Sequence, residues 1–241
     1  MRLSHRIIDW IRAQVRAAGK KGVVVGLSGG IDSSVVVVLS KKALGDNVLG
    51  LVLPCRSQVV DQEFAVRLAK KFGIKYKKAD LSSLFDMMRS VYPEAGDMAR
   101  ANLKPRLRMT ALYYFANSLD YLVAGTGNKS EIKIGYFTKH GDGGCDILPI
   151  GGLFKTEVRA LAKELELPEE IIKRPPSAGL WDGQTDENEI GMRYENLDKC
   201  LMAIETKREP SDWRMEIEKI RSRIRGSEHK RRAPPVFTRC G

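Results

Sequence analysis

The stretch Gly26-Leu27-Ser28-Gly29-Gly30-Ile31-Asp32-Ser33-Ser34 lies between two apolar runs, at 23–25 and 35–39. A β-branched run, then paired glycines and small hydroxyl residues, then a second apolar segment predicts a buried strand, a tight loop and a helix. Glycines let a backbone approach an anion closely, and serine hydroxyls and the first N–H groups of a helix can donate hydrogen bonds to it. The stretch therefore predicts a phosphate-binding loop.

Asp32 is the unusual member of this loop. A carboxylate beside bound phosphates would repel them unless a hard cation lay between, and Mg²⁺ is the natural bridge. The loop has neither the Gly-Lys-Ser/Thr ending of a Walker loop nor the spacing of a Gly-x-Gly-x-x-Gly dinucleotide fingerprint. Its letters Ser-Gly-Gly-Ile-Asp-Ser resemble the signature of the ATP pyrophosphatase family, in which the loop holds the pyrophosphate of ATP while AMP is transferred. An ordinary strand-to-helix turn would require neither the carboxylate nor three hydroxyl groups.

The rest of the chain alternates short apolar runs with segments of helical spacing. Strands are expected at 23–25, 48–54, 74–79 and 121–126, and helices at 3–18, 60–72, 81–91, 103–118, 155–166, 191–207 and 211–225. This alternation predicts an α/β fold, a doubly wound parallel sheet with helices on both faces, followed by a helical C-terminal segment. Ligands bind such sheets at the carboxyl ends of the strands, where the first loop already lies.

We expect a single domain over 1–241. Its nucleotide-binding core should occupy about 20–170, a lid loop about 175–190, and the C-terminal helices with a basic tail about 191–241.

Composition limits the class of protein. The 241 residues are 43% hydrophobic and carry a net charge of +11, which suits either nucleic acid or strongly anionic small molecules. The first residues lack a signal-peptide hydrophobic region and no window reads as a membrane span, so we expect a cytoplasmic protein without a membrane partner. The four cysteines are far apart and suggest neither zinc nor an iron–sulfur cluster.

Three further motifs identify a family. Gly-Thr-Gly-Asn-Lys-Ser-Glu at 125–131, Gly-Tyr-Phe-Thr-Lys-His-Gly-Asp-Gly-Gly at 135–144 and Ser-Glu-His-Lys-Arg-Arg at 227–232 resemble the NAD synthetase family. Together with the first loop and Asn-Leu-Lys-Pro-Arg-Leu-Arg-Met at 102–109, the resemblance covers roughly half of the chain. It implies a two-step ligation that ends NAD biosynthesis. ATP adenylates the nicotinate carboxylate of deamido-NAD with release of pyrophosphate, and ammonia then attacks the acyl adenylate to give NAD and AMP.

The resemblance also implies roles for individual residues, none of them a covalent nucleophile. Positions that match ATP-binding positions of the family are Gly26, Leu27, Ser28, Gly29, Gly30, Ile31, Asp32, Ser33, Thr126, Lys155 and Ser177. Those that match positions contacting deamido-NAD are Arg106, Lys139, Asp146, His229 and Lys230. Asp32 and Glu131 match the magnesium positions.

Several of these residues have simpler interpretations. Glu131 could be an early helix residue that favours the N-terminal dipole, and Lys139 with Asp146 could form a surface pair. The tail around His229 and Lys230 could be a solvated or nucleic-acid-binding run.

The expected partners are ATP, deamido-NAD, ammonia and a second copy of the chain, because members of this family are typically homodimers. Free ammonia, or ammonia supplied by a partner, is expected rather than glutamine, since the sequence has no Cys with the matching Glu and Lys of an amidase. A tRNA-modifying pyrophosphatase is a rival, although the cysteine pairs of many such enzymes are missing, and we expect no nucleic-acid partner. A nucleotide-binding regulatory module is a second rival, for which two metal-binding carboxylates would be surplus.

Overall fold

The computed structural model describes residues 1–91, 94–181 and 183–238 and contains a parallel sheet. Its strands are β1 (Gly22–Gly26), β2 (Val48–Val52), β3 (Lys75–Lys78) and β4 (Tyr121–Ala124), in the order β3-β2-β1-β4. Every neighbouring pair is parallel. The predicted α/β fold is confirmed, and β1, which leads into the phosphate loop, lies inside the sheet.

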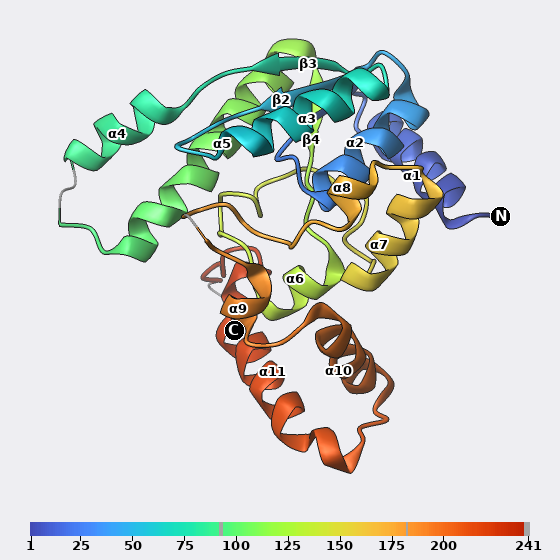
Figure 1. Cartoon of the computed structure of the whole chain (residues 1–241), viewed down its shortest axis with the longest axis vertical. Helices are drawn as coiled ribbons and strands as arrows, with labels where there is room; N and C mark the ends of the chain where they lie inside the picture. Colours follow the sequence, from blue (N-terminus) through green and yellow to red (C-terminus); the bar gives the residue numbers. More distant parts are fainter. Residues whose placement is uncertain (92–93, 182, 239–241) are drawn as a thin grey trace.

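Helices bury the two faces of this sheet (Figure 1). One face packs against α1 (Leu3–Ala17), α2 (Ile31–Leu44), α3 (Val59–Lys71) and α7 (Lys155–Glu164), and the other packs against α5 (Asp97–Leu119). In β1, Val23 and Val25 belong to the first core while Val24 belongs to the second. Both faces of the strand are therefore apolar, which explains its continuous rather than alternating hydrophobic run.

The remaining elements surround the carboxyl ends of the strands or follow them in the chain. They are α4 (Ser82–Val91), α6 (Lys129–Ile134), α8 (Glu169–Ile172), α9 (Asp186–Ile190), α10 (Tyr194–Thr206), α11 (Arg214–Gly226) and two 3₁₀ turns, Ser211–Trp213 and Glu228–Lys230. The pair α10 and α11 extends away from the sheet (Figure 1) and has its own small core, which includes Leu197, Leu201 and Ile217. None of the helices described is long and apolar enough to cross a membrane.

Four predicted helices, at 3–18, 60–72, 81–91 and 155–166, differ from the structure by one or two residues at an end, and the other three differ for identifiable reasons. The helix expected at 103–118 begins at Asp97, because Gly96 takes an extended N-cap conformation and the helix then continues through Pro105. The helix expected at 191–207 begins at Tyr194, because Gly191 with φ +79° ends the separate helix α9. The helix expected at 211–225 opens with a 3₁₀ turn and ends at Gly226. Part of the predicted lid is thus the short helix α9.

Candidate active site

The loop between β1 and α2 is shaped by its own hydroxyl groups. Gly29 adopts φ +78°, and a Cβ atom there would lie 2.3 Å from the carbonyl oxygen of Asp61, so only glycine fits without a shift of the backbone. The hydroxyl oxygens of Ser28 and Ser33 lie 3.0 Å apart, and the amide of Gly30 donates to the Ser28 hydroxyl. The Ser33 hydroxyl also lies 3.1 Å from the Gly30 carbonyl, to which it donates. These bonds hold the loop in one shape at the N-terminus of α2.

A buried ammonium joins two carboxylates beside this loop. Lys155, the first residue of α7, is 1% exposed, and its Nζ lies 2.5 Å from Asp32 and 3.1 Å from Glu131. The Asn128 side chain donates to Asp32 over 2.9 Å and accepts from the backbone amide of Glu131 over 3.0 Å. The Glu131 carboxylate in turn accepts from the Asn128 amide, which completes a capping box at the start of α6. Glu131 therefore starts a helix and also faces the loop.

Two tyrosines and a third carboxylate extend this cluster. Tyr194 is fully buried, and its hydroxyl lies 3.1 Å from Asp186 and 3.4 Å from Glu131. The Tyr136 hydroxyl donates to Asp186 over 3.1 Å and is also hydrogen-bonded to Glu189. Asp186 is the first residue of α9, so this network connects the C-terminal part of the predicted lid to the Lys155 cluster.

Tyr136, Asp186 and Tyr194 were not among the residues predicted from the sequence to form the site. Tyr136 lies inside a motif that the family resemblance uses, while Asp186 and Tyr194 open two helices near the C-terminal end of the chain. A carboxylate directly after a Gly/Pro-rich segment was the available signal. Nothing in the spacing showed that these residues face Glu131.

Burial and neighbouring charges set the protonation of the cluster. Burial raises the pKa of Glu131 to about 7 and also raises the pKa of Asp186. Burial would lower the pKa of Lys155, but the carboxylates of Asp32 and Glu131 outweigh that effect and hold this pKa above its usual value. Three carboxyl groups thus surround a single ammonium, and the cluster has an excess of acidic groups that favours a further cation.

Asp32 and Glu131 are the residues that could hold Mg²⁺. Both carboxylates line a cavity beside the phosphate loop. Oxygen is the ligand that a hard cation prefers, and the acidic excess of the cluster fits a divalent charge. Within 1–91, 94–181 and 183–238, no three or more His, Cys, Asp or Glu side chains are placed together as a metal site. Phosphate oxygens of a nucleotide would have to complete the coordination.

A cavity of about 750 Å³ connects the loop to the segment at 125–146. The predicted site residues that line it are Gly26, Leu27, Ser28, Gly30, Ile31, Asp32, Ser33, Thr126, Glu131, Lys155, Ser177 and Lys230. The predicted residues outside its lining are Gly29, Arg106, Lys139, Asp146 and His229. Most of the expected ATP positions therefore share one cavity, whereas the expected dinucleotide positions lie mainly beyond it.

The structure joins most of the expected dinucleotide positions to one another. A guanidinium nitrogen of Arg106 lies 3.5 Å from the Lys139 carbonyl, and Nζ of Lys139 donates to the His229 carbonyl over 2.8 Å. Lys230 donates to two backbone carbonyls, of residues 135 and 137, each over 2.8 Å. The predicted basic tail is therefore folded back against the 135–144 motif at this point.

Asp146 takes part in a different set of contacts. Its carboxylate accepts from the amide of Val123 over 2.7 Å and from the Tyr113 hydroxyl over 3.0 Å. Lys139 donates to a backbone carbonyl and not to Asp146, so the alternative of a surface pair between these two residues is wrong. Asp146 instead connects the chain after the 135–144 motif to β4 and α5.

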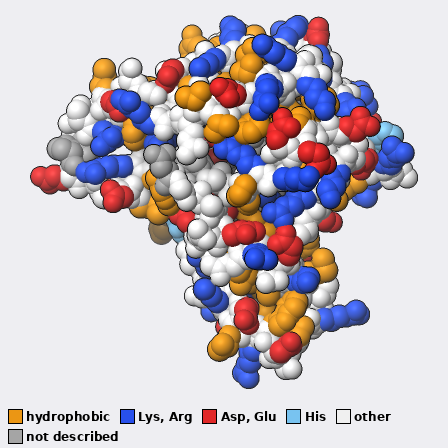
Figure 2. All heavy atoms as spheres, in the orientation of Figure 1, with side chains coloured by type: hydrophobic (Ala, Val, Ile, Leu, Met, Phe, Trp, Pro, Cys, Tyr) orange, Lys and Arg blue, Asp and Glu red, His pale blue; other side chains and the backbone are white. Residues whose placement is uncertain are grey.

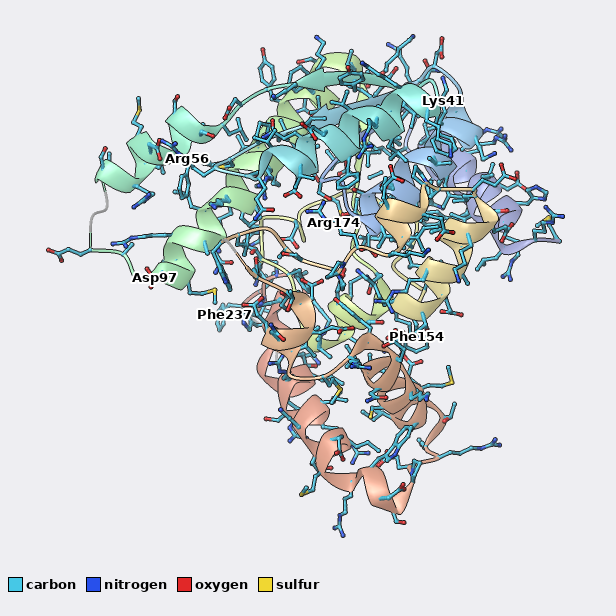
Figure 3. All side chains as sticks on the ribbon, viewed as in Figure 1. Lys41, Arg56, Asp97, Phe154, Arg174 and Phe237 are labelled. Atoms are coloured by element: carbon cyan, nitrogen blue, oxygen red, sulfur yellow. The ribbon has the colours of Figure 1, made fainter. Side chains whose placement is uncertain are left out.

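The segment expected to act as a lid lies against the body of the protein. Arg174, near the centre of the molecule in Figure 3, forms an ion pair with Asp61 of α3. Nζ of Lys104 donates to the Leu180 carbonyl over 2.6 Å. Ser177 lies between these two attachments, is exposed and lines the cavity. The segment is therefore attached on both sides of the predicted ATP-binding serine.

Comparison with known proteins distinguishes an NAD synthetase from a tRNA-modifying pyrophosphatase. The family model described as NAD synthase matches residues 3–234. The chain belongs to the NAD synthase family. It is 47% identical to the NH(3)-dependent NAD(+) synthetase of Carboxydothermus hydrogenoformans, over 97% of this chain and 96% of that protein. The protein of the same name from Methanococcus aeolicus is 53% identical over 87% of this chain and 85% of its own length.

A solved structure supports the same conclusion. The NMN synthetase from Francisella tularensis superposes with a TM-score of 0.88 at 34% identity, covering 97% of this chain and 96% of that one. This member of the NAD synthase family is a ligase that forms carbon–nitrogen bonds. The alternative of a non-catalytic regulatory module is therefore wrong, and the family favours NAD synthesis over tRNA modification.

Proposed function

We propose that this ligase converts deamido-NAD, ATP and ammonia into NAD, AMP and pyrophosphate, the last step of NAD biosynthesis. The observation that carries the proposal is the single cavity lined both by the phosphate loop and by the 125–146 segment. A reaction between two nucleotides needs both in one enclosed space, because alignment supplies much of the catalysis in phosphoryl and adenylyl transfer.

The first step joins the nicotinate carboxylate to the α-phosphorus of ATP. A carboxylate oxygen forms the new P–O bond, the bond to the β-phosphate oxygen breaks, and pyrophosphate leaves. The loop amides and the ammonium of Lys155 would stabilise the charge on the phosphates. Thr126 and Ser177, which both line the cavity, would bind ATP there.

Asp32 and Glu131 would hold Mg²⁺ against the phosphate oxygens, where it would neutralise part of their charge. The buried Tyr194 and Asn128 keep these carboxylates in place by the hydrogen bonds described above. Rigid positioning of this kind lets charged groups act without rearrangement.

In the second step, ammonia attacks the acyl carbon, the bond between that carbon and the AMP oxygen breaks, and a proton leaves the nitrogen. The acyl adenylate must be protected from water, which would hydrolyse it, and the segment at 175–190 would cover it. Ammonia as the nitrogen donor is supported by the two relatives named as NH(3)-dependent enzymes. Arg106, Lys139, Asp146, His229 and Lys230 would bind the dinucleotide.

We include a homodimer and a cytoplasmic location in the proposal. Met98 and Tyr114 of α5 are 58% and 69% exposed, which would suit an interface on that helix. Cys55, Cys145 and Cys200 are free thiols, as expected in a reducing compartment. Sedimentation velocity would measure the oligomeric state.

A second acceptor is nicotinate mononucleotide, whose amidation would give NMN. The likeness to the Francisella tularensis protein, which is named NMN synthetase, favours testing it. The chemistry at the carboxylate would be identical, so the discrimination would depend on binding the adenosine half of the dinucleotide.

The test is to mix the protein with Mg-ATP and ammonium, with deamido-NAD or nicotinate mononucleotide in parallel, and to follow AMP, pyrophosphate and the amidated product. Equal amounts of NAD and AMP with deamido-NAD, and little product with glutamine in place of ammonium, are expected. Faster NMN than NAD formation would establish the second acceptor. AMP without either product would contradict both.

A further inference from the structure

Arg108 lines the main cavity, and only neutral groups bind its side chain. It lies on α5, and its Nε donates to the Leu53 carbonyl over 3.1 Å. Its Nη2 donates to the Ser57 hydroxyl over 3.0 Å. No carboxylate oxygen among the residues described lies within ion-pair distance of this guanidinium. Nη1 takes part in neither bond, so its two N–H groups can face a ligand.

Other cationic side chains of the same cavity differ from Arg108. Arg56 pairs with a carboxylate of α4, and Arg174 pairs with a carboxylate of α3 (both arginines are labelled in Figure 3). Lys155 bridges two carboxylates. Lys230 resembles Arg108, because its partners are backbone carbonyls, and the family resemblance assigns Lys230 to substrate. Of the five cations named here, Arg108 and Lys230 have only neutral partners in the described part of the chain, which leaves the charge of each for an anionic ligand.

An uncompensated charge in this position is costly for the folded protein. Burial lowers the pKa of the Arg108 guanidinium from its ordinary value, and the distant Asp61 and Asp142 compensate only in part. Buried charges are normally paired, because their removal from water is costly. An anion that enters the cavity would supply the missing partner.

The position of Arg108 identifies that anion. One turn further along α5, Leu112 packs against Gly26, at the end of the strand that leads into the phosphate loop. Met109, which directly follows Arg108 in the sequence, packs against Gly144 in the 135–144 motif. Arg108 thus lies between the loop expected to hold ATP and a segment expected to hold the other nucleotide. The anions that meet there are nucleotide phosphates.

We infer that Arg108 binds a phosphate group of a nucleotide substrate during catalysis. The inference rests on the proposed function, which brings two phosphorylated substrates into this cavity. Planar guanidinium groups suit this task because two N–H groups can reach two phosphate oxygens. The bonds to Leu53 and Ser57 orient the guanidinium and leave Nη1 for the phosphate.

The test measures binding, one ligand at a time, so that no turnover occurs. Titration calorimetry with ATP, pyrophosphate, AMP and deamido-NAD would compare the original protein with Arg108→Gln, Arg108→Lys and Ser57→Ala. The Arg108→Gln variant should lose roughly 10- to 100-fold in affinity for at least one of these ligands, and Arg108→Lys should recover part of it. A loss with ATP and pyrophosphate would assign the phosphates of ATP to Arg108, and a loss with deamido-NAD would assign those of the dinucleotide.

Ser57→Ala removes one of the two bonds that orient the guanidinium but keeps the charge, so we expect it to lose less affinity than Arg108→Gln for the same ligand. Arg67→Gln, added to the same titrations, is the matched control for the loss of one positive charge. Arg67 lies on α3, pairs with Glu170 and is not part of the cavity lining, so the affinities of this variant should stay within about threefold of the original. Unchanged affinities of Arg108→Gln for all four ligands would overturn the inference, and so would equal losses in Arg108→Gln and Arg67→Gln. If Arg108→Gln does not fold, Arg108→Lys decides: a weakened affinity of that variant beside an unaffected Arg67→Gln supports a phosphate contact, and an unchanged affinity overturns it.

Activity of the original protein separates this inference from the proposed function. NAD formation together with unchanged binding by Arg108→Gln would leave the function and remove the role of Arg108. If no NAD forms but nucleotide binding depends on Arg108, the role of Arg108 stands and the proposed function is wrong.

Discussion

Gly29 occupies a position where a methyl group fits neither the backbone nor the space around it. We expect Gly29→Ala to lower the free energy of unfolding and to abolish ATP binding, because φ +78° is strained for alanine and the new Cβ would displace the Asp61 carbonyl. Gly19→Ala is the matched control, since it has φ +62° with nothing within 4 Å. It should lose only the backbone term of about 1–2 kcal/mol and bind ATP normally. Urea unfolding and calorimetry would measure both, and equal effects in the two variants would contradict a close approach at Gly29.

Lys155 is the residue on which the carboxylate cluster depends. Lys155→Met would leave Asp32, Glu131 and Asp186 without their ammonium, and we expect it to cost about 3–5 kcal/mol of stability and to weaken Mg-ATP binding. Lys20→Met, which breaks an exposed pair with Asp120, should leave the stability and the affinity for Mg-ATP almost unchanged. Denaturant unfolding at one pH and one salt concentration is the measurement. A Lys155→Met protein as stable as the original would show that these acidic groups do not need the ammonium.

Among the elements, the strands were the easiest to predict. Burial on both faces produces unbroken apolar runs in β1, β2 and β4, such as 23–25, whereas β3 is exposed along its length and follows a glycine. Helix boundaries were harder to predict, because the backbone conformations of Gly96 and Gly191 set them and the neighbouring residues do not indicate those conformations. The prediction for 103–118 followed apolar spacing and so missed the polar first turn of α5.

The candidate site was predictable where its residues are contiguous. The phosphate loop and the 125–131 motif each carry several site residues in one short stretch, so their letters identify them. Asp186 and Tyr194 reach Glu131 only because α9 and α10 fold back over α6, and a contact between distant segments leaves no local pattern in one sequence. The same holds for Arg108, whose charge is visible in the sequence while its neutral partners are not.

The α10–α11 pair should respond to a cavity in its own core. Leu201 is 1% exposed there, whereas its neighbour Met202 is 51% exposed. Leu201→Ala should therefore destabilise the protein by about 2–5 kcal/mol, and Met202→Ala should cost far less. Thermal and urea unfolding would measure the difference. Similar losses in both variants would mean that the exposed face of α10 is buried in solution, for example against a second copy of the chain.

At the scale of the whole molecule, the chain carries a net charge of +11. Figure 2 shows Lys and Arg side chains distributed among Asp and Glu over the visible face, with no broad region of a single sign. Nucleic-acid binding depends on several cations that contact adjacent phosphates. Mixed charges of this kind suit a protein whose anionic ligands enter a cavity.

We therefore expect tRNA to bind weakly and without consequence for catalysis. Because each phosphate contact releases counterions, tRNA binding by dispersed charges should fall steeply between roughly 50 and 200 mM salt, while NAD formation depends on ligands enclosed by the cavity and should fall much less. Fluorescence anisotropy with labelled tRNA and the NAD assay, run over the same salt series, would measure the two responses. Polyglutamate of similar length is the control for general polyanion effects in the assay. Tight tRNA binding at the higher salt, with competitive inhibition by tRNA against deamido-NAD, would show that the positive charge serves nucleic acid and that the cavity opens onto its binding surface.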